Sequence, residues 1–378
     1  MQNDKPTVAH YASKYLPLTE NWIYRTLINH EKFRPIFFAR KKENLHLFPF
    51  SDLHVLFDRT VIRRYLEIAH FVIFRYFVFF VRLAKRYRVR VLHIHFGYHG
   101  AKSVGLKREL NVPMVCSFYG DDAFAVQHEK KYGQLFREAD MILVLGKYMK
   151  QRLVELGCSA DKIVIHHLGI DVEKISFKKR TVSVAEPVKF LIASSFLPKK
   201  GIDLALKALA QLADRYEFTL DIIGDGPLRS TLLEEVEKGK IKDRVTFHGY
   251  QPYDYFINLT YQCHVLIQAS RTAESNAKEG TPMAIVDAMA SGMAIVSTKH
   301  SDIPELVIDD VTGYLAEEND LPTLINCLTR VFEDRVRIAN FSEEGRARVE
   351  REFDAHKQTA KLEGYYDQLI DKATANRN

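Results

Sequence analysis

The chain has 378 residues, of which 47% are hydrophobic, and it carries a formal net charge of +6. This length and composition predict two domains, each with its own core, and exclude a disordered chain, a collagen-like chain and a repeat array. The charge is uneven: residues 1–180 carry a net +14 and the remainder a net −8, which indicates an anionic partner for the first half.

The processing signals and cysteines favour a cytoplasmic protein. The polar start of the chain predicts no secretory signal, and no apolar stretch long enough to span a bilayer is free of charge. The cysteines are far apart in the sequence, which predicts reduced packing residues rather than a metal or disulfide pair: Cys116, Cys158, Cys263 and Cys327.

Short apolar runs alternate with helical patterns along the first half of the chain. Strands are predicted at residues 7–11, 33–38, 91–95, 114–118, 141–144 and 163–166, with helices that include 102–110 and 146–156. Residues 62–88 mix aromatic and apolar residues with arginines, which predicts a helix with an apolar side and a cationic side.

The second half repeats this rhythm. Strands are predicted at residues 189–193, 219–223, 244–247, 265–267 and 294–297, and the polar segment 175–187 between the two series is predicted to be the linker. Alternating strands and helices form parallel sheets covered on both faces, so the chain is α/β with two doubly wound domains. Ligands of such sheets bind beyond the carboxyl ends of the strands.

The segment EGTPMAIVDAMASG, residues 279–292, is the most informative part of the chain. Thr281 and Pro282 predict the start of a helix, with the hydroxyl as N-cap and the proline in the first position, and Gly292 predicts its end. Free backbone N–H groups at such a helix start form a site for a phosphate.

Two acidic residues lie near this predicted helix start. Glu279 stands just before it, where a carboxylate can accept hydrogen bonds from the hydroxyls of a sugar. Asp287 stands two turns further on, where it can accept hydrogen bonds from a ribose diol. The alternative is an acidic helix cap followed by a solvated aspartate.

Other segments that follow predicted strands carry a cation or glycines. Lys200 can neutralise a diphosphate leaving group, and the alternative is an ordinary surface lysine. Glycines follow strands in residues 222–229 and 245–250, where they let the backbone approach a ligand. The first of these segments lacks the third glycine of a dinucleotide-binding fingerprint, which disfavours an NAD-dependent oxidoreductase.

This ordered set of segments resembles the retaining GT-B glycosyltransferases of family 4, over about residues 7–370 and most specifically in the C-terminal half. The resemblance implies two Rossmann-like doubly wound domains that face each other across a cleft. Residues 1–178 would form the acceptor-binding domain and residues 179–354 the domain that binds the sugar-nucleotide donor. The C-terminal helix, about 355–378, would cross back to the N-terminal domain.

The resemblance also implies roles for residues of the second half. Glu279 would contact the donor sugar, Lys200 the diphosphate and Asp287 the ribose, with Glu279 and Lys200 as the catalytic pair. Further donor-binding residues would be Gly280, Thr281, Pro282, Met283, Gly249 and Tyr250.

The sequence departs from the family pattern at two positions of the donor site. Asp287 stands where the family has a second glutamate, and Ser195 stands where it has an arginine as the second diphosphate cation. Arg271 is our candidate for the missing charge, against the alternative of a solvated loop arginine.

The resemblance in the first half is less tight. Residues 15–24 look like the loop after the first strand in exopolysaccharide and colanic-acid-type members, which would place Glu20 in the cleft. His95 lies at a strand end, where a structural and a functional role are equally compatible with the sequence. Tyr119 stands where the family often has histidine, and Asp122 matches the acid that follows.

The family mechanism implies transfer with retention at the anomeric carbon, without a metal or another cofactor, and with the leaving phosphate taking the acceptor's proton. The donor is then a nucleotide-diphosphate sugar, with a UDP-sugar expected over a GDP-sugar. Two rivals remain open: a UDP-sugar epimerase of the same fold, and a non-catalytic sugar-nucleotide-binding scaffold or subunit of a transferase pair.

The basic, aromatic segment 62–88 bears on the acceptor. We expect it to bind the anionic inner face of the plasma membrane, which would make the protein peripheral and its acceptor a lipid-linked glycan. The alternative is a helix buried against a partner. A nucleic-acid partner is not expected, because the sequence contains no nucleic-acid-binding motif.

Overall fold

The computed structural model describes residues 5–17, 20–124 and 131–375, and its contacts divide the chain into two units. Unit 1 contains residues 1–169 and 355–378, and unit 2 contains residues 170–354. The sequence places the boundary after residue 178, whereas the contacts place it after residue 169. The reason is that Ile170, Val172 and Ile175 are buried in a core of unit 2. The segment expected to be a linker therefore belongs to unit 2, and its Arg180 is buried there.

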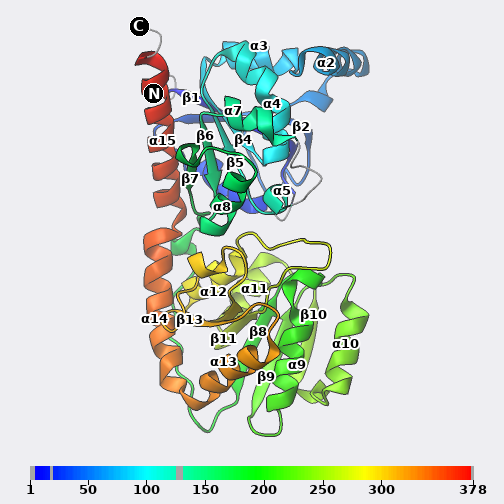
Figure 1. Ribbon diagram of the computed structural model, residues 1–378, viewed down its shortest axis with the longest axis vertical. Helices are drawn as coiled ribbons and strands as arrows, with labels where there is room; N and C mark the ends of the chain where they lie inside the picture. The colour runs from blue at the N-terminus through cyan, green and yellow to red at the C-terminus, as the bar shows by residue number, and fades with distance from the viewer. Residues whose placement is uncertain (1–4, 18–19, 125–130, 376–378) are drawn as a thin grey trace. The chain divides into compact units, whose positions relative to one another are not determined.

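Unit 1 is built on a seven-stranded sheet in the order β3-β2-β1-β4-β5-β6-β7 (Figure 1). All of its strand pairs are parallel. Its strands are β1 (Thr7–Tyr15), β2 (Arg34–Lys42), β3 (Leu53–Val55), β4 (Val89–His95), β5 (Met114–Ser117), β6 (Met141–Val144) and β7 (Ile163–Ile165).

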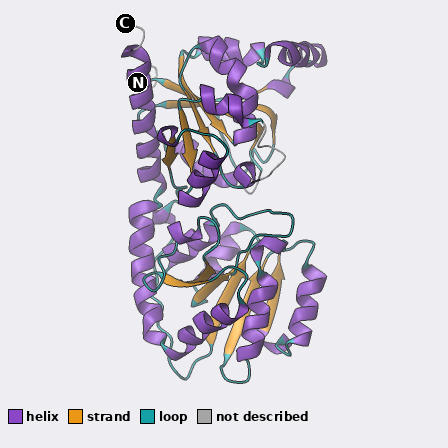
Figure 2. Cartoon of the chain, viewed as in Figure 1, coloured by secondary structure: helices purple, strands orange, loops and turns teal. Residues whose placement is uncertain are grey.

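Helices lie on both sides of this sheet (Figure 2). They are α1 (Asn21–Ile28), α2 (Val61–Phe74), α3 (Val78–Arg86), α4 (Gly97–Leu110), α5 (Asp121–Phe124), α7 (Tyr132–Glu138), α8 (Lys147–Glu155) and α15 (Ala355–Ala375). The C-terminal helix α15 packs on the sheet through Leu362, Tyr366 and Leu369, which share a core cluster with strand residues such as Val91 and Val115. The expected return of the C-terminal helix to the first domain is therefore present.

Unit 2 is built on a six-stranded parallel sheet in the order β10-β9-β8-β11-β12-β13. Its strands are β8 (Val188–Ala193), β9 (Phe218–Ile223), β10 (Val245–Gly249), β11 (Val265–Gln268), β12 (Ala294–Thr298) and β13 (Gly313–Ala316). Its helices are α9 (Ile202–Leu212), α10 (Arg229–Lys238), α11 (Tyr253–Thr260), α12 (Met283–Ser291), α13 (Leu321–Glu333) and α14 (Arg335–Glu352).

The central strand β8 shows why the second sheet needs helices on both faces. Successive side chains of a strand point to opposite faces. Phe190 and Ile192 are buried in one core cluster of unit 2, and Leu191 is buried in the other. Both faces are thus covered, which explains the continuous apolar runs that predicted these strands.

Each predicted strand is present, with ends that move by a few residues, but β3 and β13 were not predicted. Both are short, and Gly313 and Ala316 of β13 are weak strand formers. They exist because a neighbouring strand, β2 or β12, supplies the hydrogen bonds of a parallel pair.

The single amphipathic helix predicted over residues 62–88 is wrong. The segment forms two helices, α2 and α3, which are separated at Arg75. Arg75 has a φ of 62°, in the left-handed region, and its N–H bonds to the carbonyl of Phe71 as a C-cap. A left-handed residue ends an α-helix, and nothing in the apolar periodicity of the segment marks it.

Candidate functional site

The Glu279 and Lys200 side chains form an ion pair in unit 2. Glu279 lies in the loop between β11 and α12, and Lys200 ends the short 3₁₀ turn Pro198–Lys200 that follows β8. Their side chains are only 10% and 15% exposed. Burial would raise the pKa of the Glu279 carboxyl, but the nearby cations, Lys200 and then Lys199, outweigh it and hold the pKa below its ordinary value. Glu279 is therefore a carboxylate at neutral pH.

Gly201 allows the Lys200 turn to approach the Glu279 loop. Its φ of 61° is left-handed, and a Cβ built on it would lie 1.8 Å from the carbonyl oxygen of Ala269, just after β11. The backbone N–H of Arg271 bonds to the carbonyl of Lys199 at 2.9 Å, so the two segments are held side by side. The carboxyl ends of the adjacent parallel strands β8 and β11 thus bring Lys200 to Glu279.

Arg271 and Ser195 occupy different surroundings. The Arg271 guanidinium donates to Asp203 at 2.8 Å and to the carbonyl of Pro198 at 3.2 Å, so its charge is matched by a carboxylate within the protein. Ser195 is exposed in the loop after β8. Arg271 thus lies beside the Lys200 turn, but its charge is already paired with Asp203.

Helix α12 begins at Met283, with Pro282 rather than Thr281 at the N-cap position and without a side-chain cap. The predicted N-cap is therefore shifted by one residue, because Pro282 has an extended ψ of 96°. The predicted end is confirmed, since Gly292 is the left-handed C-cap with a φ of 96°. Gly280 is buried just before this start.

Asp287 lies on α12 and is buried rather than solvated, with 4% exposure. Its Oδ1 accepts a hydrogen bond of 2.8 Å from the Tyr253 hydroxyl at the start of α11. Tyr253 follows Gly249 and Tyr250, which end β10 and begin the next loop. Gly249 has a φ of 68° and faces open space, and Tyr250 is 70% exposed. The hydrogen bond between Tyr253 and Asp287 thus connects the start of α11 to α12.

Two residues beside Glu279 were missed by the sequence reasoning. His300 Nε2 is 3.0 Å from the backbone nitrogen of Glu279, and His300 Nδ1 is 2.8 Å from Glu318. They come from the segments that follow β12 and β13, and no local pattern links them to Glu279.

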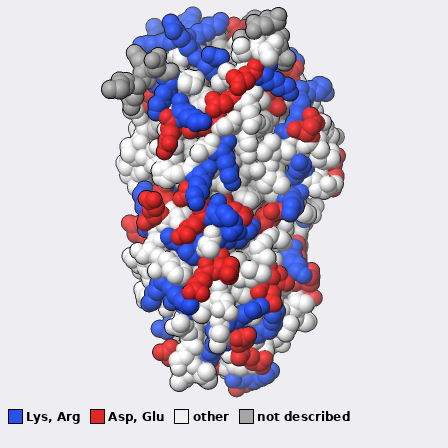
Figure 3. Space-filling model, turned by 90° about the vertical axis from the view of Figure 1, so that its left-hand side faces the viewer, with Lys and Arg blue, Asp and Glu red and all other residues white. Residues whose placement is uncertain are grey.

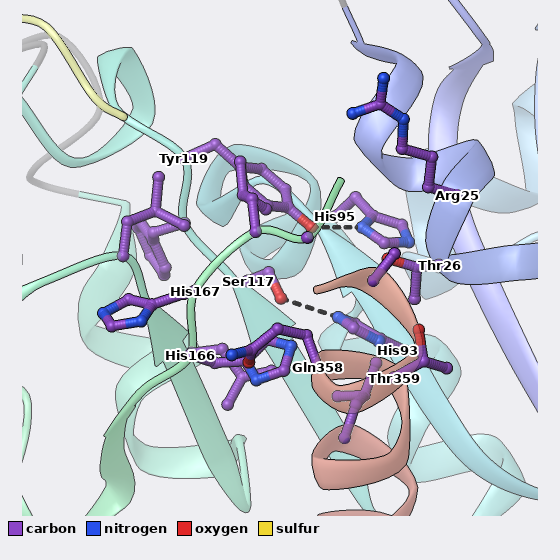
Figure 4. Close-up of a pocket in the computed structure, with 17 residues that line it drawn as sticks. Arg25, Thr26, His93, His95, Ser117, Tyr119, His166, His167, Gln358 and Thr359 are labelled. Carbon is purple, nitrogen blue, oxygen red and sulfur yellow. Dashed lines mark hydrogen bonds between the residues drawn. The ribbon is translucent and has the colours of Figure 1, made fainter. Parts of the chain in front are cut away.

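In unit 1, a pocket lies at the carboxyl ends of β4, β5 and β6, where it also meets α1 and α15 (Figure 4). His95 and Tyr119 both line it, and the Tyr119 hydroxyl is 2.7 Å from His95 Nδ1. Its other polar lining residues are Arg25, Thr26, His93, Ser117, His166, His167, Gln358 and Thr359. The structure thus brings together two of the four predicted acceptor-side residues.

The other two predicted acceptor-side residues, Asp122 and Glu20, do not line this pocket. The buried Asp122 carboxylate accepts hydrogen bonds of 2.8–2.9 Å from the backbone N–H groups of Gly97, Tyr119 and Gly120, and so holds two loops together. Burial raises its pKa to about 6 in spite of these bonds. Burial likewise raises the pKa of Glu20, which precedes α1, to about 7. Leu18 and Thr19 of the same predicted loop lie outside the described residues.

A chain of buried imidazoles lies behind Tyr119. His95 Nε2 is 3.0 Å from His10 Nδ1, and His10 Nε2 is 3.1 Å from His30 Nε2. His30 Nδ1 is in turn 3.0 Å from Glu363 on α15. Glu363 Oε1 also accepts from the backbone N–H groups of residues 31–33, so a carboxylate fixes one end of the chain. No local sequence pattern indicates this chain, because its members come from four separate segments.

His10 and His95 of this chain, together with the neighbouring His93, form the one group of metal-ligating side chains found among the described residues. Both ring nitrogens of each already have hydrogen-bond partners, which for His93 are the hydroxyls of Tyr366 and Ser117. Burial, then the neighbouring imidazoles, lower the pKa of each of the three, to about 3 for His95. The cluster is therefore a set of neutral imidazoles whose ring nitrogens are satisfied by one another and by neighbouring hydroxyls.

Helix α2 presents an apolar surface. Seven of its large side chains are more than half exposed: Val61, Ile62, Tyr65, Leu66, Val72, Ile73 and Phe74. Arg63 and Arg75 are exposed on the same segment. By contrast, the face of the molecule in Figure 3 mixes basic with acidic side chains. Within the part of the chain that is described, no helix combines the length and the apolar character needed to cross a bilayer.

Two family models match the chain. The model described as glycosyl transferases group 1 matches residues 173–348, and the model described as glycosyltransferase family 4 matches residues 31–174. The amylovoran biosynthesis glycosyltransferase AmsK of Erwinia amylovora is 32% identical over 282 residues, which are 72% of this chain and 68% of that protein.

Solved structures share the fold. The HepE protein of Anabaena in complex with UDP superposes with a TM-score of 0.79 at 17% identity, over 96% of this chain and 100% of that chain. The same protein in complex with UDP-glucose superposes with a TM-score of 0.75 at 16% identity, over the same shares of the two chains. These similarities confirm two Rossmann-like units of the GT-B type.

Proposed function

Because the chain belongs to the glycosyltransferases of family 4, described as group 1, we propose that it transfers a hexose-type sugar from a nucleotide-diphosphate sugar to a glycan. The observation that carries the proposal is the buried ion pair between Glu279 and Lys200, beside the start of α12 in unit 2.

Lys200 and the start of α12 would hold the diphosphate. A phosphate near Lys200 competes with the Glu279 carboxylate for the same ammonium, so donor binding loosens the ion pair. Glu279 is then available to accept hydrogen bonds from the donor sugar, while the N–H groups around Met283 face the phosphate. Positive charge that is already in place where the leaving group develops negative charge is usually the largest catalytic contribution.

The transfer itself would proceed with retention and without a metal, as the family resemblance implies. The bond between the anomeric carbon and the diphosphate oxygen breaks, and the acceptor oxygen bonds to the same face of that carbon. The leaving phosphate takes the acceptor's proton, so no protein base is needed.

A UDP-sugar is the proposed donor. Its support is the fold shared with HepE of Anabaena, which has been solved with UDP and with UDP-glucose. Asp287, which already accepts a hydrogen bond from Tyr253, would accept another from the ribose, with the backbone near Gly249 and Tyr250 beside the base.

The acceptor is proposed to be a lipid-linked glycan of a bacterial surface polysaccharide. The name of the relative from Erwinia amylovora, which refers to amylovoran biosynthesis, supports a polysaccharide. The pocket of unit 1, with Tyr119 and His95 in its wall, offers hydroxyls, imidazoles and an amide that suit the hydroxyls of a sugar.

Helix α2 is the proposed contact with the membrane. Its exposed apolar side chains next to arginines suit the boundary between headgroups and acyl chains of an anionic bilayer. The protein would then work in the cytoplasm, as a peripheral protein on the inner face of the plasma membrane.

A thermal-shift screen with UDP, GDP, ADP and CMP at saturating concentration tests the donor site. At about 100 times its Kd, a ligand of the native state adds about 3 kcal/mol of stability. We expect UDP to raise the melting temperature most. The absence of a shift with every nucleotide would contradict the donor site proposed for unit 2.

One observation favours a second candidate, a non-catalytic sugar-nucleotide-binding subunit. Ser195 replaces the usual diphosphate arginine, and the charge of Arg271 is matched by Asp203. Such a subunit would bind UDP but would neither hydrolyse nor transfer the sugar of any UDP-sugar. Turnover by the purified protein excludes it.

A further inference from the structure

The loop that carries Glu279, residues 269–282, has neither helix nor strand over its length. Its middle is closed by a turn, in which the N–H of Asn276 bonds to the carbonyl of Ala273 and the N–H of Ala273 to that of Ala277. A carboxylate that must meet a sugar needs a fixed position, since loss of geometry at a reacting centre costs rate steeply. The contacts that hold the two ends of this loop therefore matter.

Glu318, which follows β13, binds the loop at its first end. Its Oε1 accepts a hydrogen bond of 2.6 Å from the backbone N–H of Thr272, and its Oε2 lies 2.8 Å from His300 Nδ1. His300, fully buried after β12, binds the loop at its second end through the contact of 3.0 Å between its Nε2 and the backbone nitrogen of Glu279. One pair of side chains thus holds both ends of the loop.

The hydrogen bonds fix the tautomer of His300. A backbone N–H can only donate, so Nε2 must accept and the ring proton must be on Nδ1, where it is donated to the Glu318 carboxylate. Burial lowers the pKa of His300 in spite of Glu318, which acts in the opposite direction. The other charged groups that face the ring are Lys278, which lowers the pKa, and Glu279, which raises it. His300 is therefore neutral at physiological pH, which is the form that the loop needs.

We propose that His300 and Glu318 are positioning residues for the donor sugar, which act by holding the backbone of Glu279. The proposal rests on the proposed function, in which Glu279 contacts the sugar and Lys200 the diphosphate. Their loss should therefore weaken the recognition of the sugar and leave that of the diphosphate intact.

Protonation of His300 at low pH should weaken the recognition of the sugar in the same way as the loss of His300. An imidazolium carries a proton on Nε2, which would point at the N–H of Glu279, so the second end of the loop would lose its acceptor. Because the folded-state pKa is depressed, the contact is complete at neutral pH and is lost as the pH falls through that pKa. Sugar recognition should then fall on acidification, while UDP binding falls less.

Two substitutions separate the halves of this contact. The amide of glutamine reaches the place of Nε2, and the amide of asparagine reaches that of Nδ1. His300→Gln therefore keeps an acceptor for Glu279 and loses the bond to Glu318, whereas His300→Asn keeps a donor for Glu318 and loses the bond to Glu279. The two variants are matched in polarity and differ in which contact they retain.

The first measurement is amide hydrogen exchange at Glu279 in the ligand-free full chain, followed by NMR. We expect exchange about tenfold faster in His300→Asn than in the wild type, as for the loss of one hydrogen bond, and near wild-type exchange in His300→Gln. Equal exchange in all three proteins would overturn the inference, whatever the activity of the protein.

The second measurement is calorimetric binding of UDP, UDP-glucose, UDP-galactose and UDP-N-acetylglucosamine. We expect His300→Asn to bind UDP as the wild type does. The ratio of its affinity for the preferred UDP-sugar to its affinity for UDP should be about tenfold lower than in the wild type. His300→Gln should keep this extra affinity for the UDP-sugar and lose its dependence on pH.

The two proposals fail in different ways. If the wild type binds no UDP-sugar more tightly than UDP, the proposed contact of Glu279 with the sugar is wrong. If it does, and His300→Asn retains the full extra affinity although its Glu279 amide exchanges faster, the positioning role alone is wrong.

Discussion

At the scale of single residues, the pairing of Glu279 with Lys200 is the feature from which the chemistry follows. Two buried charges are costly to desolvate unless each has a partner, and each is the other's partner in the ligand-free protein. In the proposed function, a donor diphosphate replaces the carboxylate as the partner of Lys200. The ion pair therefore holds the Lys200 side chain in place before the donor arrives.

Glu279→Gln should separate binding from turnover. Without the carboxylate, Lys200 loses its ion-pair partner, so UDP should bind several-fold more tightly, while turnover of the UDP-sugar should fall by about 10² to 10³. Calorimetry with UDP and a coupled assay of UDP release measure the two effects. Lys200→Met is the matched control, because it should weaken UDP binding. Wild-type turnover in Glu279→Gln would refute the catalytic assignment.

At the scale of elements, helix α2 is apolar but does not cover a core. Ile62, Leu66 and Ile73 are 66–74% exposed, so their truncation should cost little folding free energy. The replacement of all three by serine should lower binding to phosphatidylglycerol vesicles by about tenfold or more, through lost burial in the interface. Sedimentation with vesicles measures this binding.

The control for this experiment comes from unit 2. Val336 is 74% exposed on α14, so Val336→Ser removes an equally exposed apolar side chain from another helix and should leave vesicle binding unchanged. UDP binding should be the same in all variants. If the triple variant sediments with vesicles as the wild type does, α2 is not the membrane contact.

Helix α15 binds the first unit by a polar contact as well as by its apolar face. Glu363 Oε1 accepts from His30 and from three backbone N–H groups. Its pKa is lowered, because these hydrogen bonds outweigh the effect of burial. Glu363→Ala would leave four donors without an acceptor, so we expect a loss of about 2–4 kcal/mol in the free energy of unfolding of unit 1.

Glu363→Gln provides the comparison for this prediction. Its amide oxygen can still accept these bonds, so the loss should be well under half of that in the alanine variant. Urea unfolding followed by the fluorescence of Trp22, the single tryptophan of the chain, reports on unit 1. An alanine variant as stable as the wild type would show that α15 is held by its apolar face alone.

At the scale of the whole molecule, the two units should respond differently to acid. Among the described residues, unit 1 contains six histidines whose pKa is depressed, mainly by burial: His10, His54, His93, His95, His99 and His166. In unit 2 the described histidines with a depressed pKa are His264 and His300. The buried imidazoles are thus concentrated in the first unit.

Acidification should therefore unfold unit 1 before unit 2. Below about pH 6.5 the histidines of the unfolded chain bind protons, whereas the buried imidazoles of the folded protein stay neutral until the pH is lower. Stability is thus complete above that pH and is lost as the pH falls toward the folded pKa values, by up to about 1.4 kcal/mol per pH unit for each group. Asp122 and Glu20, with pKa values raised to about 6 and 7, act in the opposite direction but are fewer.

Urea titrations between pH 7.5 and 4.5 measure this difference. The transition seen by Trp22 fluorescence should move to lower urea as the pH falls, ahead of the far-ultraviolet circular dichroism signal, to which both units contribute. UDP should delay only the later transition. Coincident transitions at every pH would contradict the separate acid response of the units.

The sequence alone determined the α/β class, the two doubly wound units and the helix that follows Glu279. These features follow from short-range patterns: apolar runs mark buried parallel strands, and proline and glycine mark the ends of α12. The same sequence reading singled out Lys200, and the family resemblance implied that it contacts the diphosphate. The helix break at Arg75 was not predicted, because a left-handed residue other than glycine does not change the apolar periodicity of the sequence.

Only the tertiary structure decided which side chains meet. The order of strands in the sheets brings Lys200 to Glu279 and His300 with Glu318 to the two ends of one loop. It also pairs Arg271 with Asp203. The chain of imidazoles that ends at Glu363 depends on how α15 packs against the first sheet. Each of these contacts joins residues from separate segments, and neither composition nor spacing along the chain encodes which strand ends become neighbours.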